Sequence, residues 1–388
     1  MSVWDRVVGQ EPVIAEFRRA VAGAPDNRAM THAWLVTGPP GSGRSVAAEA
    51  FATALVCPSG GCGACDSCAS VAAGRHSDVA VVKPAGVIMG VDQTRALVSR
   101  IAVMPGRSDW NVVVIEDADR LNEHADNALL KSLEEPPDHG VWILCAPSAD
   151  DVLPTIRSRC RVVRLRTPPI DEVARFLRDS LGADPALAAY AARSSQGHIG
   201  RARALVLDAD ARRQHQVVLH LPQRLGSVAA CLAAAGDLVA AARSRAEAIA
   251  DPLDAAEEAE LLRAYGDGAT GAGSARGRAG AALKELERDQ RNRRRRLVRD
   301  ELDRVLVDLQ GLYRDVLSVA VGGAVPLINE EARAEVEQLA AATDGPGVLE
   351  RLDAIAQARR AVAADGSEDL VLAELTLALQ RPSTQRRG

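Results

Sequence analysis

The chain of 388 residues is 47% hydrophobic and 26% charged, a balance that excludes a disordered chain and is typical of folded globular proteins. Its length predicts two or three domains, at roughly 150 residues each. The net charge of −5 gives no overall attraction to nucleic acid, so any contact with DNA must come from a local basic patch or from a partner. No segment approaches the roughly 20 apolar residues of a membrane span, and the first residues have no apolar signal core. We therefore expect a cytoplasmic protein with no membrane contact.

The first part of the chain alternates short apolar runs with stretches of helical composition. Five of these runs are predicted strands: 33–36, 79–82, 112–115, 141–145 and 162–165. Apolar strands that are separated by helices are typical of a parallel sheet with both faces covered. The sequence therefore predicts an α/β domain at the start of the chain.

A glycine-rich turn follows the first predicted strand and leads into a helix predicted over residues 45–55. Residues 38–45 read Gly-Pro-Pro-Gly-Ser-Gly-Arg-Ser. The spacing and the strand–turn–helix context are those of a Walker A loop, in which backbone N–H groups and the helix dipole hold phosphates. The candidate nucleotide-binding residues of this turn are Gly38, Gly41, Gly43, Arg44 and Ser45.

Arg44 stands where a Walker A loop carries lysine, whereas Ser45 keeps the hydroxyl that binds magnesium. A lysine reaches the terminal phosphates as a compact point charge, while an arginine is a bulky planar fork. We therefore predict a P-loop fold with impaired or absent hydrolysis, and leave open whether nucleotide binds without being hydrolysed. The alternative is a glycine-rich turn that holds no ligand, which the flanking strand and helix disfavour.

Four of the seven cysteines are clustered within residues 57–68 with the spacing C-x4-C-x2-C-x2-C: Cys57, Cys62, Cys65 and Cys68. In a reducing compartment this spacing favours a metal site over disulfides. Thiolates on such short loops can surround one tetrahedral zinc ion, and four protein ligands leave no open position, so we expect a structural zinc. An iron–sulfur cluster would use the same ligands, but nothing in the sequence suggests electron transfer.

Two acidic residues, Glu116 and Asp117, follow the third predicted strand. A Walker B strand ends in Asp-Glu, where the first acid binds magnesium and the second polarises the attacking water. In the reversed order found here, the magnesium position carries the longer glutamate and the water-polarising position carries the shorter aspartate. Each carboxylate is therefore displaced from its usual place, and a displacement of about an ångström can cost roughly a hundredfold in rate. The alternative is a solvated acidic helix N-terminus, which the helix dipole favours. Read as Walker B, the pair again predicts impaired hydrolysis.

After Pro168 and Pro169 no further strand is predicted. Three helices are expected as a small unit: 170–181, 185–194 and 199–207. The remainder is rich in Ala, Leu and Arg with helical periodicity, interrupted by Gly, Ala and Ser residues typical of a flexible loop near 266–280. A basic run at 288–296 is typical of a solvated helix face; a contact with an acidic partner or with a phosphate backbone is the alternative.

Several motifs resemble one family, the AAA+ subunits of sliding-clamp loaders. Residues 127–137 read Asn-Ala-Leu-Leu-Lys-Ser-Leu-Glu-Glu-Pro-Pro, and residues 158–160 read Ser-Arg-Cys. Residues 7–10 and 31–33 are similar to the family's N-terminal signatures, and the four cysteines stand where bacterial members carry a zinc module. The resemblance covers residues 1–205, beyond which there is only a helical region of suitable length.

The resemblance implies both a fold and an assembly. The expected fold is an AAA+ P-loop core with a parallel sheet and a zinc module over residues 1–167, a three-helix lid over 168–208 and an all-α collar domain over 209–388. Such subunits work in the DNA polymerase III holoenzyme, in a hetero-pentamer with gamma/tau and delta subunits. This assembly uses ATP to load the sliding clamp onto primer–template DNA, at the nucleoid-associated replisome in the cytoplasm.

The resemblance also implies a role for Arg159, the arginine of the Ser-Arg-Cys motif. In the family this residue reaches the terminal phosphate bound by the neighbouring subunit and acts in trans as an arginine finger. Cys160 is then expected to be a packing residue and not a nucleophile. Arg159 is therefore the one catalytic candidate of the chain.

The chain departs from the family's motor subunits at each nucleotide-handling position. Those subunits carry a P-loop lysine, an Asp-Glu pair, a sensor hydroxyl and a lid arginine. The corresponding positions here are Arg44, Glu116-Asp117, Ala146-Pro147 next to Ser148, and Gly200 next to Arg201. A shift of one residue in the alignment would instead place Arg201 in the role of the lid arginine. These departures resemble the delta-prime type, a scaffold that donates a finger without hydrolysing ATP and is expected to be a monomer when isolated. The alternatives are a gamma/tau-type motor subunit, which binds and hydrolyses ATP, and an unrelated AAA+ helicase or remodeller.

Overall fold

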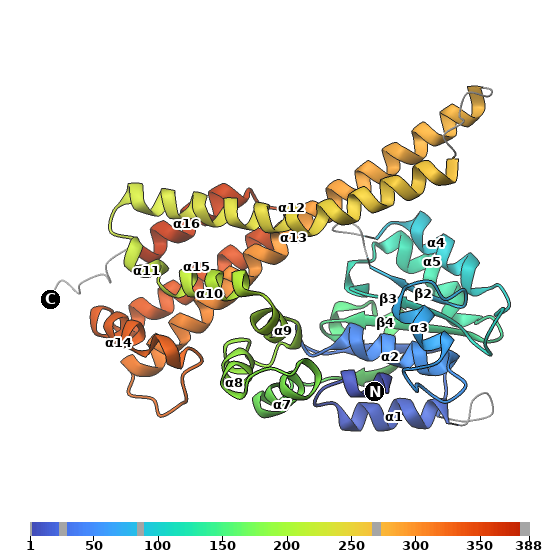
Figure 1. Ribbon diagram of the computed structural model, residues 1–388, viewed down its shortest axis with the longest axis horizontal. Coiled ribbons are helices and arrows are strands. Elements are labelled where there is room, and N and C mark those ends of the chain that lie inside the picture. The colour runs from blue at the N-terminus through green and yellow to red at the C-terminus, as the bar shows by residue number, and fades with distance from the viewer. Residues whose placement is uncertain (1, 23–28, 84–88, 266–272, 381–388) are drawn as a thin grey trace. The chain divides into compact units, whose positions relative to one another are not determined.

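The structure, a computed structural model, describes residues 2–22, 29–83, 89–265 and 273–380. The chain divides into two compact units, residues 1–207 and residues 208–388. In Figure 1 the first unit runs from blue to green and the second from green to red. None of the described helices combines the length and the apolar composition that crossing a membrane requires.

The first unit is built on a parallel sheet with the strand order β2-β3-β4-β1-β5. The five strands are β1 (Ala33–Thr37), β2 (Val79–Val82), β3 (Asn111–Ile115), β4 (Gly140–Ala146) and β5 (Arg161–Arg164). All five overlap predicted strands: β1, β3 and β4 are apolar runs that are buried throughout, whereas β2 and β5 are only partly buried. The predicted parallel α/β sheet is confirmed.

Helices cover both faces of this sheet. They are α1 (Glu11–Val21), α2 (Arg44–Val56), α3 (Asp66–Ala72), α4 (Val91–Ile101), α5 (Glu123–Glu134) and α6 (Pro154–Arg157), with short 3₁₀ turns η1 (Val3–Arg6), η2 (Ala118–Arg120) and η3 (Ala149–Asp151). Alternate residues of β1 point to opposite faces: Trp34 packs with Phe17 of α1 and Phe51 of α2, and Leu35 lies in the cluster that contains Leu129 of α5. The sheet is therefore a central layer between two helical layers (Figure 1).

The three helices predicted after the sheet are present with the predicted bounds, as α7 (Ile170–Leu181), α8 (Pro185–Ser194) and α9 (Ile199–Leu207). They share a small apolar core of their own that includes Val173, Leu177 and Ala191. Gly182 ends α7 in the left-handed conformation with φ +62°. Asp184 caps α8 by accepting from the N–H groups of its first turn.

The second unit is helical throughout its described residues. Its helices are α10 (Ala209–Leu219), α11 (Leu221–Arg224), α12 (Val228–Tyr265), α13 (Gly273–Ala320), α14 (Arg333–Ala342), α15 (Gly345–Ala363) and α16 (Glu368–Gln380), with η4 (Glu330–Ala332) before α14. Helices α12 and α13 lie side by side as a long hairpin (Figure 1). Leu302, Leu306 and Leu309, at the helical spacing that predicted this region, are fully buried in its core.

The predicted loop near 266–280 is helical in part. Residues 273–280 form the start of α13, and residues 266–272 lie outside the described residues. A loop was predicted because this segment is rich in glycine, each of which destabilises a helix by about 1 kcal/mol relative to alanine. The alanines among them are the strongest helix formers, and they continue directly into the long helix.

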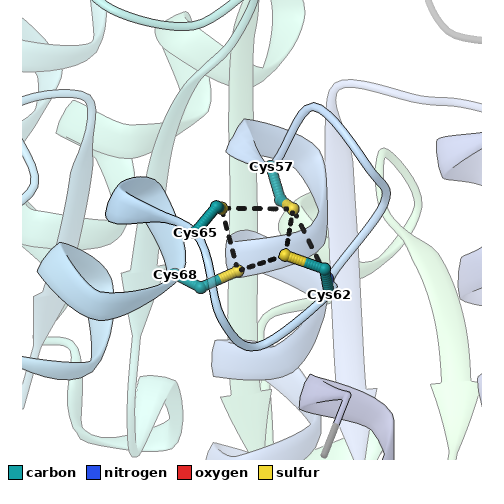
Figure 2. Close-up of side chains that lie close together, drawn as sticks. All are labelled: Cys57, Cys62, Cys65 and Cys68. Carbon is teal, nitrogen blue, oxygen red and sulfur yellow. Dashed lines mark hydrogen bonds between the residues drawn. The ribbon is translucent and has the colours of Figure 1, made fainter.

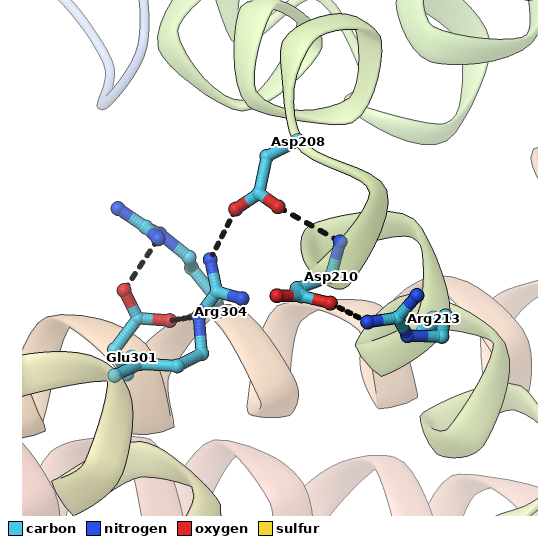
Figure 3. Close-up of polar contacts among 6 residues, drawn as sticks. Asp208, Asp210, Arg213, Glu301 and Arg304 are labelled. Carbon is cyan, nitrogen blue, oxygen red and sulfur yellow. Dashed lines mark hydrogen bonds and ion pairs between the residues drawn. The ribbon is translucent and has the colours of Figure 1, made fainter. Parts of the chain in front are cut away.

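An ion-pair network fixes the start of the second unit (Figure 3). Asp208 caps α10 by accepting from the N–H of Asp210 at 2.8 Å, and its other oxygen lies 3.0 Å from Arg245 Nη2. Arg245 Nε also lies 3.2 Å from one carboxylate oxygen of the buried Glu301, whose other oxygen lies 2.6 Å from Arg304 Nη1. One side chain of α12 therefore joins the N-terminus of α10 to α13.

Candidate functional site

The glycine-rich turn lies between β1 and α2, as its sequence predicts. Gly43 precedes α2 with φ +89°, and Gly41 has φ +82°, so both adopt the left-handed conformation that favours glycine. The turn is held to the sheet by the Gly38 N–H, which donates to the Pro147 carbonyl at 3.2 Å. The backbone thus has the strand–turn–helix form that a phosphate loop requires.

The side chain of Arg44 bonds the loop itself. Its Nη1 donates to the carbonyl oxygen of Gly38 at the beginning of the same turn. A guanidinium that binds a backbone carbonyl of the loop is turned toward the protein and away from the position where a P-loop lysine meets terminal phosphates.

The segment before α9 closes on the same turn. The N–H of Ile199 donates to the Gly41 carbonyl at 3.4 Å, and a Cβ atom on Gly41 would lie 2.3 Å from Cγ of His198. Arg201, the candidate lid sensor, lies in the first turn of α9, where its N–H donates to His198 Nδ1 at 3.3 Å. His198 therefore lies where the segment between α8 and α9 meets the glycine-rich turn.

The two acids after β3 differ in their surroundings. Glu116 continues the β2–β3 ladder through its N–H, which donates to the Val82 carbonyl, and its Oε2 lies 3.5 Å from Nζ of Lys83. Asp117 has φ +50°, a left-handed conformation that is uncommon outside glycine. Lys83 was missed by the sequence reasoning. The parallel pairing of Val82 with Ile115 places the next residue of each strand side by side.

The sensor position after β4 has a structural role. Ser148 caps η3, because its Oγ accepts from the Asp150 N–H at 3.3 Å and its own N–H donates to Asp151 Oδ2 at 2.9 Å. Cys145, at the end of β4, is fully buried, and burial raises the pKa of its thiol. Because β3, β4 and β1 are neighbouring parallel strands, the acidic pair after β3 and the glycine-rich turn after β1 lie at the same carboxyl edge of the sheet.

Arg159 follows the short helix α6 and precedes β5. Its Nη1 donates to the Thr155 carbonyl at 2.7 Å and to Ser158 Oγ at 3.3 Å, and its Nη2 donates to Glu134 Oε1 at 2.6 Å. The side chain is 35% exposed. Burial raises the pKa of the neighbouring Cys160 to about 12, which keeps that thiol protonated and agrees with a packing role.

The structure brings Gly38, Arg44 and Glu116 together at the carboxyl end of the sheet. It does not bring Arg159 to them, because the described contacts of Arg159 are with its own segment and with the end of α5.

The four clustered cysteines converge on one point between α2 and α3 (Figure 2). Their sulfur atoms lie within 4.8 Å of one another, and the Cys57–Cys65 and Cys65–Cys68 separations are 3.6 and 3.5 Å. A tetrahedral zinc ion with Zn–S bonds of about 2.3 Å needs sulfur separations of about 3.8 Å. The cluster therefore fits a zinc ion, which these four residues would hold.

The surroundings of the cluster favour the thiolate at Cys57 and the protonated thiol at Cys68. The N–H of Cys62 lies 3.4 Å from Cys57 Sγ, and the N–H of Gly63 lies 3.3 Å from Cys68 Sγ. Burial alone would raise the pKa of Cys57, but hydrogen bonds from the backbone of Cys62, Gly61 and Ser59 outweigh it and lower the pKa to about 6. Burial raises the pKa of Cys68 to about 12, so zinc must displace a proton from this thiol on binding.

The basic run of α13 meets acids of the same chain. Arg293 lies 3.1 Å from Asp254 Oδ1 and also pairs with Glu257, while Arg294 lies 2.7 Å from Asp254 Oδ2 and 2.9 Å from Asp251 Oδ1. The hydrogen bond from Arg293 lowers the pKa of Glu257. Pairing within the chain was not predicted: the acids that Arg293 and Arg294 contact belong to α12, not to a partner. The acids lie three residues apart along α12, but the pairing depends on the register of α13 against α12, which the sequence does not specify.

Comparison with known proteins finds similarity in the first part of the chain. Residues 9–169 match the family model described as DNA polymerase III, delta subunit. The gamma/tau subunit of Mycobacterium tuberculosis H37Rv is 38% identical over 168 residues, which are 42% of this chain and 28% of that protein. The delta′ subunit of Pseudomonas aeruginosa is 38% identical over 161 residues, 40% of this chain and 49% of that protein. The tau subunit of Escherichia coli K12 is 30% identical over 220 residues, 54% of this chain and 33% of that protein.

The matches span about half or less of the length of each of these relatives. Among solved structures, a DNA polymerase III gamma subunit-related protein from Thermotoga maritima matches with a TM-score of 0.43 and 16% identity, over 95% of this chain and 99% of that one. The RuvB Holliday junction branch migration motor of Thermotoga maritima matches with a TM-score of 0.37 and 18% identity, over 54% of this chain and 63% of that one. Residues 9–169, which carry the glycine-rich turn, the acidic pair and Arg159, are thus similar to the clamp-loader subunits of DNA polymerase III.

Proposed function

We propose that the chain is a delta-prime-type subunit of the DNA polymerase III clamp loader. In this role it is a scaffold that does not hydrolyse ATP itself. It supplies Arg159 to the nucleotide site of a neighbouring gamma/tau subunit during loading of the sliding clamp onto primed DNA. The partners would be gamma/tau and delta subunits in a hetero-pentamer, which acts at the replisome in the cytoplasm.

The contact between Arg44 and Gly38 carries this proposal. A motor subunit needs a cation that points into the loop to meet the β- and γ-phosphates. Here the cation at that position bonds the loop's own carbonyl, so the loop keeps the phosphate-binding backbone without a charged group directed at phosphate. For hydrolysis this hydrogen bond would have to break, and the longer, planar guanidinium of Arg44 would have to bind the phosphates in place of a lysine ammonium.

The acidic pair supports the same conclusion. Glu116 lies beside Lys83, and a magnesium ion would have to compete with this cation for the carboxylate. The family's catalytic glutamate position is taken by Asp117, which has a shorter side chain and a backbone in the left-handed conformation. Both acids thus differ from the pair that positions magnesium and water for phosphoryl transfer.

The finger assignment is supported by what Arg159 offers to a neighbour. It is partly exposed, its guanidinium has donors beyond those used within the chain, and it lies in the Ser-Arg-Cys motif of the family. We further propose that residues 1–167 act as the AAA+ core with a structural zinc at 57–68, residues 168–208 as the lid, and residues 209–388 as the collar that joins the subunits.

A gamma/tau-type motor is the second candidate, and one observation favours nucleotide binding. Ser42 Oγ is buried in the loop with no hydrogen-bond partner among the described residues. Its hydroxyl could therefore donate a hydrogen bond to a phosphate oxygen or to a water. Ser45 also keeps the hydroxyl for magnesium. Under this alternative Arg44 would turn from Gly38 to the phosphates when ATP binds.

ATP hydrolysis by the purified full chain tests the proposal against this alternative. We expect no turnover by the wild-type chain. We also expect none by an Arg44→Lys variant, because the acidic pair stays reversed, although this variant should bind Mg-ATP more tightly once the Gly38 contact is lost. Steady ATP hydrolysis by the wild-type chain alone, lost in Arg44→Ala, would show that the chain is a motor subunit and would contradict the proposal.

A further inference from the structure

Arg159 shares its guanidinium with Glu134, the last residue of α5. The distance of 2.6 Å between Arg159 Nη2 and Glu134 Oε1 is that of a strong charge-assisted hydrogen bond. The other nitrogen, Nη1, is held by Thr155 and Ser158 of Arg159's own segment. These three bonds leave two of the five N–H donors, one on Nη2 and one on Nε, for another acceptor.

Helix α5 gives Glu134 a fixed support. Leu133, next to Glu134, and Leu129, one turn before Leu133, are buried in the apolar cluster that covers the Leu35 face of the sheet. Ser132 Oγ accepts a hydrogen bond from the indole of the buried Trp142 at 3.1 Å. The backbone that carries the Glu134 carboxylate is therefore anchored to the sheet through contacts that do not involve Arg159.

A carboxylate at this position is unfavourable for the helix that carries it. The C-terminal end of a helix has a partial negative charge, which an acidic residue in the last turn reinforces and a nearby cation relieves. Glu134 receives such a cation from Arg159, whereas the adjacent Glu135, also exposed, makes no ion pair with any described residue. The two glutamates have the same charge and neighbouring positions, but only Glu134 contacts the finger candidate.

We propose that Glu134 is a positioning residue for the arginine finger. It restricts the rotamers of Arg159, so that the two remaining donors are already oriented when the neighbouring subunit presents its nucleotide. This inference rests on the proposed function, in which Arg159 acts in trans. A freely rotating arginine side chain would have to be ordered during the reaction, and a displacement of about an ångström at a reacting centre can cost roughly a hundredfold.

The test uses the full chain reconstituted with the other loader subunits, the clamp and primed DNA. Glu134→Ala should lower the kcat of ATP hydrolysis by about fivefold, as expected for an exposed ion pair, and should leave KM for ATP unchanged because the finger acts in the transition state. Glu134→Gln should recover part of the loss, since its amide oxygen still accepts from Nη2. The matched control, Glu135→Ala, should retain the wild-type rate, and thermal unfolding of each variant checks that the fold is kept.

Two further variants separate this inference from the proposed function. If Glu134 acts only through Arg159, the double variant Arg159→Ala/Glu134→Ala should be no slower than Arg159→Ala alone. An unchanged rate in Arg159→Ala would overturn the proposed function and this inference together. A large loss in Arg159→Ala with Glu134→Ala indistinguishable from Glu135→Ala would overturn the positioning role alone. A faster rate in Glu134→Ala would also overturn it, because the carboxylate would then be restraining the finger.

Discussion

His198 contacts the phosphate loop at a point where only glycine fits. Gly41 is left-handed, and its hydrogen faces a ring whose Cγ would be 2.3 Å from a Cβ atom. The sequence identifies Gly41 by the spacing of the motif, but not this contact, because His198 lies far along the chain, between α8 and α9. Arg44 is similar: its type was read directly from the sequence, while its bond to Gly38 depends on the rotamer that the folded loop allows.

The Gly41→Ala variant should lose stability by about 2–5 kcal/mol. Left-handed backbone costs a residue with a side chain about 1–2 kcal/mol, and overpacking against His198 adds about 1–3 kcal/mol. Gly74 is the control: its φ of +66° is similar, but nothing lies within 4 Å of a Cβ there, so Gly74→Ala should cost only the strain. Tryptophan fluorescence during denaturant unfolding measures both, since all four tryptophans belong to the first unit. Equal losses in the two variants would contradict the contact.

The cysteine segment is an element that stabilises its neighbours. The N–H of Val3 donates to the Gly61 carbonyl at 3.0 Å, and the indole of Trp4 donates to the Gly60 carbonyl at 3.1 Å. The turns between the cysteines thus hold η1 against α2. A metal that fixes these turns would therefore also fix the N-terminal residues.

We predict one zinc ion per chain, measured by metal analysis of the purified protein. Cys62→Ser should lose the metal and lower the melting temperature of the first unit, because three remaining ligands no longer close the tetrahedron. Cys160→Ala, outside the cluster, should keep the full zinc content. Iron in place of zinc, or equal metal content in Cys62→Ser and wild type, would contradict a structural zinc site.

The long helices of the second unit mark the limit of what could be predicted at this scale. Their helical character was evident from the periodicity that buries Leu302 and Leu306. The pairing of Arg293 and Arg294 with acids of α12 was not, since it depends on the register between two helices that the sequence does not specify. The same limit hid Lys83 next to Glu116, a contact made by strand pairing.

For the whole molecule, sequence reasoning was strongest where local patterns and motifs agree. The five strands and the three helices of α7–α9 were predicted because apolar runs, helix caps and prolines mark them. The candidate site was predicted in its residue types, while its internal contacts, Arg44 with Gly38 and Arg159 with Glu134, required the fold. The clamp-loader motifs recognised in the sequence all lie in the first unit, and the match to the family model ends at residue 169.

The central claim is that Arg159 completes a nucleotide site on another subunit. ATP hydrolysis by the reconstituted loader with clamp and primed DNA tests it most directly, comparing wild type, Arg159→Ala and Arg157→Ala. Arg157 is a suitable control, because its side chain is 37% exposed, close to the 35% of Arg159, and pairs within the chain with Asp150. We expect Arg159→Ala to lose about a hundredfold or more of the stimulated rate attributable to the neighbouring site, since fingers contribute about 10³–10⁵, and Arg157→Ala to stay near wild type. Equal rates for the two variants would contradict the account.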